Sequence, residues 1–244
     1  MKYGIISDIH SNYEALNTVL KNMGKVDQVI CLGDIVGYGP NPNKCIEKIR
    51  KLKSLCIAGN HDLAVINELD KFYFNIEARN AIQWTKKILK IGNIQYLEGL
   101  KNEITLSCKI KIAHGSPGQY RWEYIIDKSF AAMIFNAFKF NVLFIGHSHL
   151  AGCFIFQKKR RKIEYIELKY GGYILLSENN RYIINCGSVG QPRDGNPQAS
   201  YGIFDNVKNK VIVKRINYPI LLTQKKILDA GLPRIFAYRL KIGR

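Results

Sequence analysis

Every histidine in this 244-residue chain stands just after an apolar run typical of a β-strand, and each has a polar neighbour that can bind a metal. The five are His10, His61, His114, His147 and His149. Histidines used only for packing would scatter over helix faces and loops. In open α/β sheets, ligands bind where the carboxyl ends of strands lead into loops. The pattern therefore predicts a metal site, with more than one ion, at several strand ends.

Composition indicates a single folded domain over residues 1–244. Hydrophobic residues make up 47% of the chain, enough to bury a large core. The first residues are too soon interrupted by Asp8 to form a signal peptide, and no apolar run approaches the roughly 20 residues of a membrane-spanning helix. We expect a cytoplasmic protein with no membrane partner, and its six cysteines, which lack Cys-x-x-Cys spacing, to be buried free thiols.

The net charge of +18 favours anionic partners such as phosphorylated metabolites or nucleic acid. The densest basic run, residues 158–162, lies between two apolar stretches. It is either a solvated hairpin tip or a weak contact for nucleic acid or another polyanion. Nucleic-acid binding would need aromatic stacking residues or a basic helix face, and the run itself supplies neither.

Apolar runs at residues 3–6, 26–32 and 54–58 alternate with two segments of helical spacing. The first helix is expected to open with a capping box formed by Ser11 and Glu14, and the second at Asn41 and Pro42. Strands that alternate with helices in this way predict a parallel sheet built from βαβ units.

The rest of the chain departs from that rhythm. Residues 63–100 carry one clear helix, at about 77–89, and are expected to form a helical insertion beside the site, with Ile88 on its buried face. From residue 152 onward the pattern indicates short antiparallel strands, followed by a helical tail at about 219–244. The fold class is therefore α/β, with two mixed β-sheets packed face to face and flanked by helices.

Seven side chains at five strand ends offer oxygen or imidazole ligands. They are Asp8, His10, Asp34, Asn60, His114, His147 and His149. A single tetrahedral ion needs about four protein ligands or fewer, so this set is too large for one. Two ions about 3.5–4 Å apart could share a carboxylate and stabilise an in-line displacement at phosphorus.

The order and type of these motifs resemble those of the calcineurin-like metallophosphoesterases. The motifs are Asp8-Ile9-His10, Gly33-Asp34, Gly59-Asn60-His61-Asp62, His114-Gly115 and Gly146-His147-Ser148-His149. Residues 37–40, 185–194 and 231–233 look like the small prokaryotic phosphodiesterase branch. The resemblance covers nearly the whole chain and implies a four-layer α-β-β-α sandwich.

The resemblance also implies a role for each residue. Asp8, His10 and His149 would bind one metal, and Asn60, His114 and His147 the other, with Asp34 bridging both. A hydroxide held by the two ions would attack phosphorus. His61 would act as the general acid, and Asp62 would orient it.

The natural metals and the substrate are less defined by the sequence. Nitrogen and oxygen ligands without thiolate suit Mn²⁺, Fe, Zn²⁺, Co²⁺ or Ni²⁺, and the family resemblance favours manganese. Arg193 is a candidate for holding a substrate phosphate, or an ordinary loop arginine. Tyr38 is a candidate for lining the site, or part of a simple turn. The aromatic residues 72–74 could form a local core or a platform for base stacking.

Phosphodiester hydrolysis is the function that we expect from these features. The alternative is a phosphomonoesterase acting on phosphoserine or phosphothreonine in proteins, or on dinucleotide polyphosphates. A remote alternative is an inactive scaffold of the same fold, although the motifs are intact. Serine hydrolase chemistry is excluded because the nucleophile elbow needs Gly-x-Ser-x-Gly and position 150 is Leu. Amidohydrolases place His-x-His after the first strand, whereas here it follows a late one.

Overall fold

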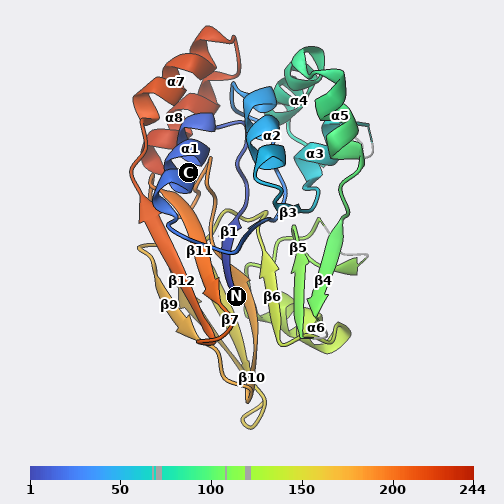
Figure 1. Cartoon of the computed structure of the whole chain (residues 1–244), viewed down its shortest axis with the longest axis vertical. Helices are drawn as coiled ribbons and strands as arrows, with labels where there is room; N and C mark the ends of the chain where they lie inside the picture. The colour runs from blue at the N-terminus through green and yellow to red at the C-terminus, as the bar shows by residue number, and fades with distance from the viewer. Residues whose placement is uncertain (68, 70–72, 108, 119–121) are drawn as a thin grey trace.

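The computed structural model describes residues 1–67, 69, 73–107, 109–118 and 122–244, and two six-stranded sheets form its centre (Figure 1). The first sheet comprises β1 (Lys2–Ile6), β2 (Gln28–Cys31), β3 (Leu55–Cys56), β9 (Gly172–Leu175), β11 (Ala199–Asp205) and β12 (Lys210–Ile216). The second comprises β4 (Glu103–Ser107), β5 (Ile110–Ala113), β6 (Val142–Ile145), β7 (Gly152–Gln157), β8 (Lys162–Glu167) and β10 (Asn180–Asn185). Their strand orders are β3-β2-β1-β11-β12-β9 and β4-β5-β6-β10-β7-β8.

Both sheets are mixed. Strands β1, β2 and β3 run parallel in the first sheet, and β5, β6 and β10 do so in the second. The remaining strands pair antiparallel with these or with one another. The sequence order had indicated a parallel half followed by an antiparallel half. Instead the chain after Gly152 adds antiparallel strands to both sheets, and the prediction of two mixed sheets is confirmed.

Alternate side chains of the central strands pack into different apolar clusters, because successive side chains of a strand point to opposite faces of the sheet. Ile5 and Phe144 belong to the apolar cluster between the two sheets. Their neighbours face outward: Ile6 joins the cluster under the helices of the first sheet, and Ile145 joins the cluster under the helix of the second. Each central strand is therefore buried on both faces, which explains why it reads as a continuous apolar run.

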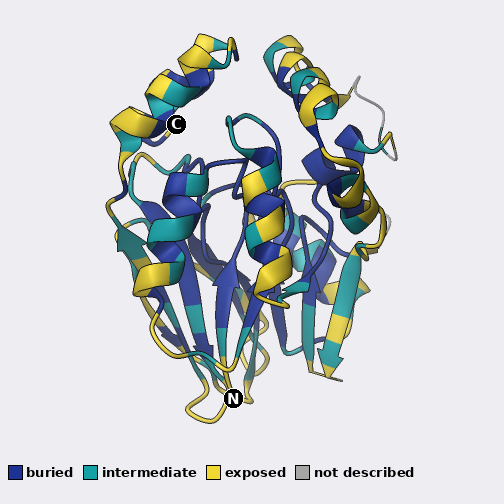
Figure 2. Cartoon of the chain, turned by 45° about the horizontal axis from the view of Figure 1, so that its top comes forward, coloured by how far each residue is buried: buried dark blue, intermediate teal, exposed yellow. Residues whose placement is uncertain are grey.

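Helices cover the outer faces of both sheets and stand above the strand ends (Figures 1 and 2). They are α1 (Tyr13–Asn22), α2 (Pro42–Lys51), α3 (Asn60–Val65), α4 (Ile76–Ile88), α5 (Ile91–Glu98), α6 (Lys128–Ala137), α7 (Ile220–Asp229) and α8 (Arg234–Ile242). The buried residues of α1 and α2 pack on the first sheet, and those of α6 pack on the second. The result is the four-layer α-β-β-α arrangement.

Local differences from the sequence-based predictions have physical causes. The cap of α1 is Asn12, whose side-chain oxygen accepts a hydrogen bond from Ala15 N at 3.1 Å, so the predicted capping box of Ser11 and Glu14 is wrong. Helix α4 buries residues 78, 81, 82 and 85, which leaves Ile88 39% exposed rather than buried. The expected insertion also contains a second helix, α5, which packs Leu97 into the core of the first sheet.

The basic run lies at a hairpin tip. Residues 158–161 connect β7 to β8, and Lys162 begins β8. Because β7 starts three residues after His149 and extends for six residues, the tip lies about 20 Å from that end of the strand. This agrees with the prediction of a solvated hairpin tip.

Two further expectations from the sequence concern membrane-spanning helices and the cysteines. Among the helices in the described part, none has the length and apolar composition needed to cross a bilayer. Buried free thiols are found at Cys31, Cys45, Cys56, Cys153 and Cys186, and Cys108 lies outside the described residues.

The core between the sheets predicts a large effect of truncation at Phe144, which is fully buried against Phe204 with ring centroids 5.3 Å apart. We expect Phe144→Ala to lower the free energy of unfolding by about 3–5 kcal/mol, because it leaves a cavity between two sheets that cannot close. Urea unfolding followed by circular dichroism measures this. Val207→Ala, in a turn and 78% exposed, is the control and should change stability by less than about 0.5 kcal/mol.

Candidate metal centre

The carboxyl ends of five strands meet at one edge of the sandwich, and the polar residues that follow them converge there. Asp8 and His10 follow β1, Asp34 follows β2, Asn60 follows β3, His114 follows β5, and His147 and His149 follow β6. The structure brings all seven predicted ligands together at this edge. Each sheet supplies part of the set, so neither could form the centre alone.

The ligand atoms form two buried groups that share one carboxylate. Asp8, His10, Asp34 and His149 form the first group, and Asp34, His114 and His147 form the second, each with its ligand atoms within 4.8 Å of one another. The amide oxygen of Asn60 lies 3.0 Å from His114 Nε2 and so borders the second group. Either group could hold a metal ion, and Asp34 could contact both.

Hydrogen bonds to backbone carbonyls determine which ring nitrogen of His10 and of His149 carries the proton. A carbonyl oxygen can only accept, so His10 Nδ1 donates to Val36 O at 3.2 Å and His149 Nδ1 donates to Gln191 O at 2.5 Å. In the neutral rings, each Nε2 then carries a lone pair. These two Nε2 atoms lie 3.1 Å apart, also facing the carboxylates of Asp8 and Asp34 at 3.4 Å. A cation between them would satisfy all four groups.

The second group differs from the first because one of its histidines is protonated. Burial favours a neutral ring at His114, but the Asp34 and Asp8 carboxylates outweigh it and raise the pKa of His114 to about 10. The ring is therefore protonated without metal, with Nδ1 donating to Leu32 O at 2.7 Å and Nε2 3.3 Å from Asp34. His147 donates from Nε2 to Trp122 O at 3.1 Å, which leaves its Nδ1 available as a ligand. A metal ion here would displace the proton of His114.

The two carboxylates also fit a metal. Asp8 Oδ2 is fully buried and has no hydrogen-bond partner among the described residues, and burial raises the pKa of Asp8 to about 6. Burial also acts to raise the pKa of Asp34, but His114 and His61 outweigh it and hold that pKa well below its usual range. Carboxylates with unused oxygen lone pairs beside the neutral imidazoles of His10 and His149 form a suitable donor set for a divalent transition metal.

The backbone around these ligands adopts an unfavourable conformation. Asp8, His10, Asp34, His147 and His149 all have φ between 46° and 64°, a left-handed region that non-glycine residues rarely occupy. Hydrogen bonds between the loops hold it: Asp8 N donates to Gly33 O, His10 N donates to Asp34 O, and His147 N donates to Asp8 Oδ1. Residues held this way cluster at functional sites.

His61, Tyr38 and Arg193 form a connected group beside the ligands. His61 Nε2 lies 2.9 Å from the Tyr38 hydroxyl, which accepts a hydrogen bond from Arg193 Nη2 at 3.2 Å. Burial lowers the pKa of His61 to about 4, and its Nδ1 has no partner among the described residues. Arg193 also donates to Gln191 Oε1 at 3.0 Å, while its Nε lacks a described partner. Three of the sequence-predicted catalytic and substrate-binding residues, His61, Tyr38 and Arg193, are therefore connected through the Tyr38 hydroxyl.

Asp62 supports this group through the backbone. Its oxygens accept hydrogen bonds from Ile35 N, Val36 N and Gly59 N at 3.0–3.2 Å, and no described contact joins it to the His61 ring. The carboxylate thereby ties the loop after β2 to the loop after β3. Any effect of Asp62 on His61 passes through these loops.

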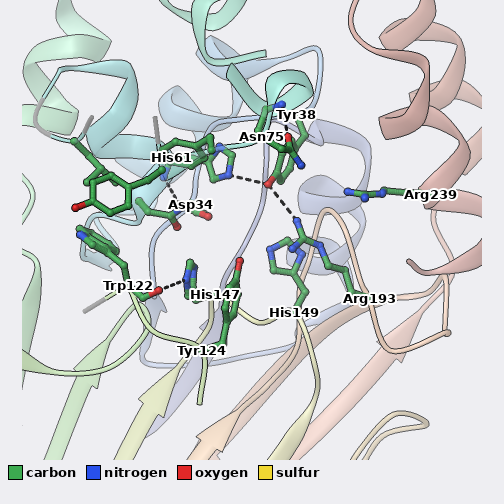
Figure 3. Close-up of a pocket in the computed structure, with 15 residues that line it drawn as sticks. Asp34, Tyr38, His61, Asn75, Trp122, Tyr124, His147, His149, Arg193 and Arg239 are labelled. Carbon is green, nitrogen blue, oxygen red and sulfur yellow. Dashed lines mark hydrogen bonds between the residues drawn. The ribbon is translucent and has the colours of Figure 1, made fainter. Parts of the chain in front are cut away.

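A cavity of about 300 Å³ opens above the ligands (Figure 3). Asp34, Asn60, His61, His147 and His149 line it, together with Tyr38 and Arg193. Tyr73 and Phe74 also line it, and Phe74 contacts the ring of His61, whereas Phe72 lies outside the described residues. Sequence reasoning missed further lining residues: Asn75, Trp122, Tyr124 and Arg239. Tyr124 stacks on His147 at 4.2 Å, but no motif marks it in the sequence.

Comparison with known proteins decides the family. The model of the calcineurin-like phosphoesterase superfamily domain matches residues 1–209. The chain belongs to this superfamily. The sequence resemblance is thereby confirmed, and with it the assignment of the chain to a family of hydrolases that act on phosphate esters.

Relatives of this phosphoesterase span its whole length. It is 41% identical to the uncharacterised protein MJ0912 of Methanocaldococcus jannaschii, over 98% of this chain and 97% of that one. A metallophosphoesterase from Sphaerobacter thermophilus shares 40% identity, with a TM-score of 0.88 over 100% of this chain and 99% of the other. The hypothetical protein PH1004 from Pyrococcus horikoshii is 19% identical, with a TM-score of 0.76 over 100% and 98%, and shows the same fold.

The shared carboxylate predicts that Asp34→Asn weakens both metal sites at once. We expect the wild-type protein to bind two equivalents of Mn²⁺, and the variant to bind both at least roughly 100-fold more weakly because a direct ligand of each is lost. Calorimetric titration of the metal-free protein measures this. Asp229→Asn, at an exposed position on α7, is the matched control. An Asp34→Asn variant that binds two equivalents normally would contradict the assignment.

Buried neutral histidines predict that the metal-free protein is acid-sensitive. Burial lowers the pKa of His61 to about 4 and that of His147 to about 3, and holds the pKa of His10 and His149 well below its usual range. In the unfolded chain these rings take up protons near pH 6.5. As the pH falls, the unfolded state therefore binds more protons than the folded state, and the free energy of unfolding decreases.

Two acids offset part of this effect. Burial raises the pKa of Asp8 to about 6 and that of Asp62 to about 7, so the folded state also takes up protons. The net expectation is a loss on the order of 2 kcal/mol in the free energy of unfolding between pH 6.5 and 5. Urea unfolding in EDTA measures it, and a constant or rising stability over this range would show the prediction to be wrong.

Proposed function

We propose that this phosphoesterase uses two divalent metal ions and acts preferentially on phosphodiesters. The observation that carries the proposal is Asp34, which belongs to two buried ligand groups at the floor of an open cavity. A water-activating centre needs such ligands beside space for substrate. His61 and Arg193 line the same cavity and supply groups that could move a proton and bind an anion.

The ligands divide into two sets in this proposal. Asp8, His10 and His149 would hold one ion, and Asn60, His114 and His147 would hold the other, with Asp34 available to both. When bound, two such ions lower the pKa of a water molecule and stabilise charge on phosphoryl oxygens. The mixture of nitrogen and oxygen donors suits manganese, iron, zinc, cobalt or nickel, and we favour manganese.

Arg193 binds the substrate phosphate in this scheme. Its guanidinium lies beside Tyr38 in the cavity wall, and the buried Nε has no described partner. A planar guanidinium matches two oxygens of a phosphate, and charge-assisted hydrogen bonds of this kind are strong. The Tyr38 hydroxyl, which already contacts Arg193 and His61, keeps both side chains aimed into the cavity.

His61 protonates the leaving oxygen. Its ring is neutral because burial lowers its pKa to about 4. An entering phosphate anion would raise that pKa and so favour the protonated ring. The ring is held in place by contacts with Tyr38 at 4.4 Å and with Phe74 at 4.8 Å between ring centroids. A proton given to the leaving alkoxide makes it a better leaving group.

The shape of the cavity supports a diester substrate. A diester carries an organic group on each side of phosphorus, and Figure 3 shows lining residues on both sides of the ligands, with Trp122 on one and Arg239 on the other. Assays of the metal-loaded enzyme with bis(p-nitrophenyl) phosphate and p-nitrophenyl phosphate test the preference. Faster turnover of the monoester would favour a phosphatase, and no turnover of either would favour an inactive scaffold.

The role of His61 predicts a dependence on the leaving group. His61→Gln should keep its metal content, because the ring is not a ligand, but lose roughly 100-fold or more in kcat for an alkyl phosphodiester. Loss for the p-nitrophenyl ester should be smaller, since nitrophenolate leaves without protonation. Metal analysis and paired kinetics on the two esters measure this. Equal slowing of both esters would argue against proton donation by His61.

A further inference from the structure

An arginine from the last helix reaches the cavity. Arg239 of α8 lines it together with the metal-ligand residues and Arg193 (Figure 3). It lies outside residues 1–209, the part of the chain that the family model matches. The match to the family model therefore does not extend to this residue.

Packing fixes the position of Arg239 beside the site. Phe236, one helical turn earlier on α8, contacts the ring of Tyr38 with centroids 4.6 Å apart. Phe236 and Leu240 are buried in a cluster that includes Ala81 of α4. Residues three apart on a helix lie on the same face. The contact of Phe236 with Tyr38 therefore places Arg239 next to the wall formed by Tyr38 and Arg193.

The side chain of Arg239 has no ion pair or hydrogen bond with any residue that the structure describes. Three cations on neighbouring elements do form ion pairs: Lys225 with Asp229, Lys226 with Glu14, and Arg215 with Asp194. An arginine held at a cavity by a rigid helix but without a carboxylate partner leaves its five N–H donors available to a ligand. The ligand that matches this geometry is an anion.

We propose that Arg239 binds a second phosphate of the substrate. The scissile phosphate would lie over the metal ligands and against Arg193, and another phosphate of the same molecule would bind at Arg239. The proposal deepens the function proposed above and rests on it. It narrows the substrate class to phosphate esters that carry two phosphates, such as a nucleotide with a diester at one position and a monoester at another.

The remaining lining fits the organic part of such a molecule. Figure 3 shows Trp122 and Arg239 on opposite sides of the ligands, with His147 and Arg193 between them. Tyr73 and Tyr124, which are 76% and 46% exposed, add aromatic surface to the cavity. Aromatic side chains stack on bases and tolerate different ones. The volume of about 300 Å³ is at the lower end of small-molecule sites and exceeds the needs of a phosphate alone.

A matched pair of substrates tests the proposal. Thymidine 5′-(p-nitrophenyl phosphate) and its 3′-phosphorylated form differ only in the second phosphate. We expect the wild-type enzyme to prefer the 3′-phosphorylated form in kcat/KM by about tenfold or more, as charge-assisted hydrogen bonds allow. Arg239→Gln should abolish the preference, which is read as the ratio of kcat/KM for the two esters on the same variant. Lys241→Gln, an exposed position on the same helix, removes the same charge and should keep the preference.

Binding provides a readout that does not depend on turnover. Calorimetry should show thymidine 3′,5′-bisphosphate binding the metal-loaded protein about tenfold more tightly than thymidine 5′-monophosphate, and Arg239→Gln should remove the difference. Equal binding of the two ligands by the wild type, or an equal loss in Arg239→Gln and Lys241→Gln, would overturn the proposal. If no diester is hydrolysed, the proposed function fails, while the binding comparison still decides the role of Arg239.

Discussion

Lone pairs that face one another in a buried site are the constraint on which this structure depends. His10 and His149 direct Nε2 atoms at each other at 3.1 Å, and the carboxylates of Asp8 and Asp34 lie beside them. Such an arrangement is unfavourable in a dry interior unless a cation occupies it. In the second group a proton on His114 supplies part of that charge. The fold therefore places, at one edge of the two sheets, a set of groups whose stability and chemistry both depend on bound positive charge.

The two-sheet architecture makes such a set possible. A polar residue in the middle of a buried strand would disrupt a core, but a polar residue just after the strand does not. Five parallel strands of the two sheets end at the same edge, and each contributes one or two residues from a short loop. The loops are bound to one another rather than to solvent, with Asp62 joining those after β2 and β3. Rigid loops on a rigid scaffold suit metal binding.

Much of this could be predicted from the sequence because the signals are local. An apolar run followed by Asp-x-His or Gly-Asp predicts both the strand and a candidate ligand, and the structure brings Asp8, His10 and Asp34 together. Contacts made by tertiary packing leave no such signal. The N-cap of α1 depended on competition between Ser11, Asn12 and Glu14, and the spacing alone could not decide it.

Residues that reach the cavity from distant elements are harder still to predict from the sequence. Arg239 is one of 37 lysines and arginines, and only the packing of α8 on Tyr38 distinguishes it from the rest. Tyr124 likewise depends on a loop that brings it against His147. The roles assigned to His61, Asp62, Arg193 and Tyr38 come from motif resemblance and stay predictions, although the side chains do lie together.

The origin of the ligands in both sheets has a mechanical consequence. Asp8, Asp34 and Asn60 follow strands of the first sheet, whereas His114, His147 and His149 follow strands of the second. Contacts such as Phe144 on Phe204 set the thickness of the apolar layer between the sheets. This thickness determines the distance between the candidate ligands that follow the first sheet and those that follow the second. Evolution could thus tune the reactivity of the centre by repacking a layer that no substrate ever touches.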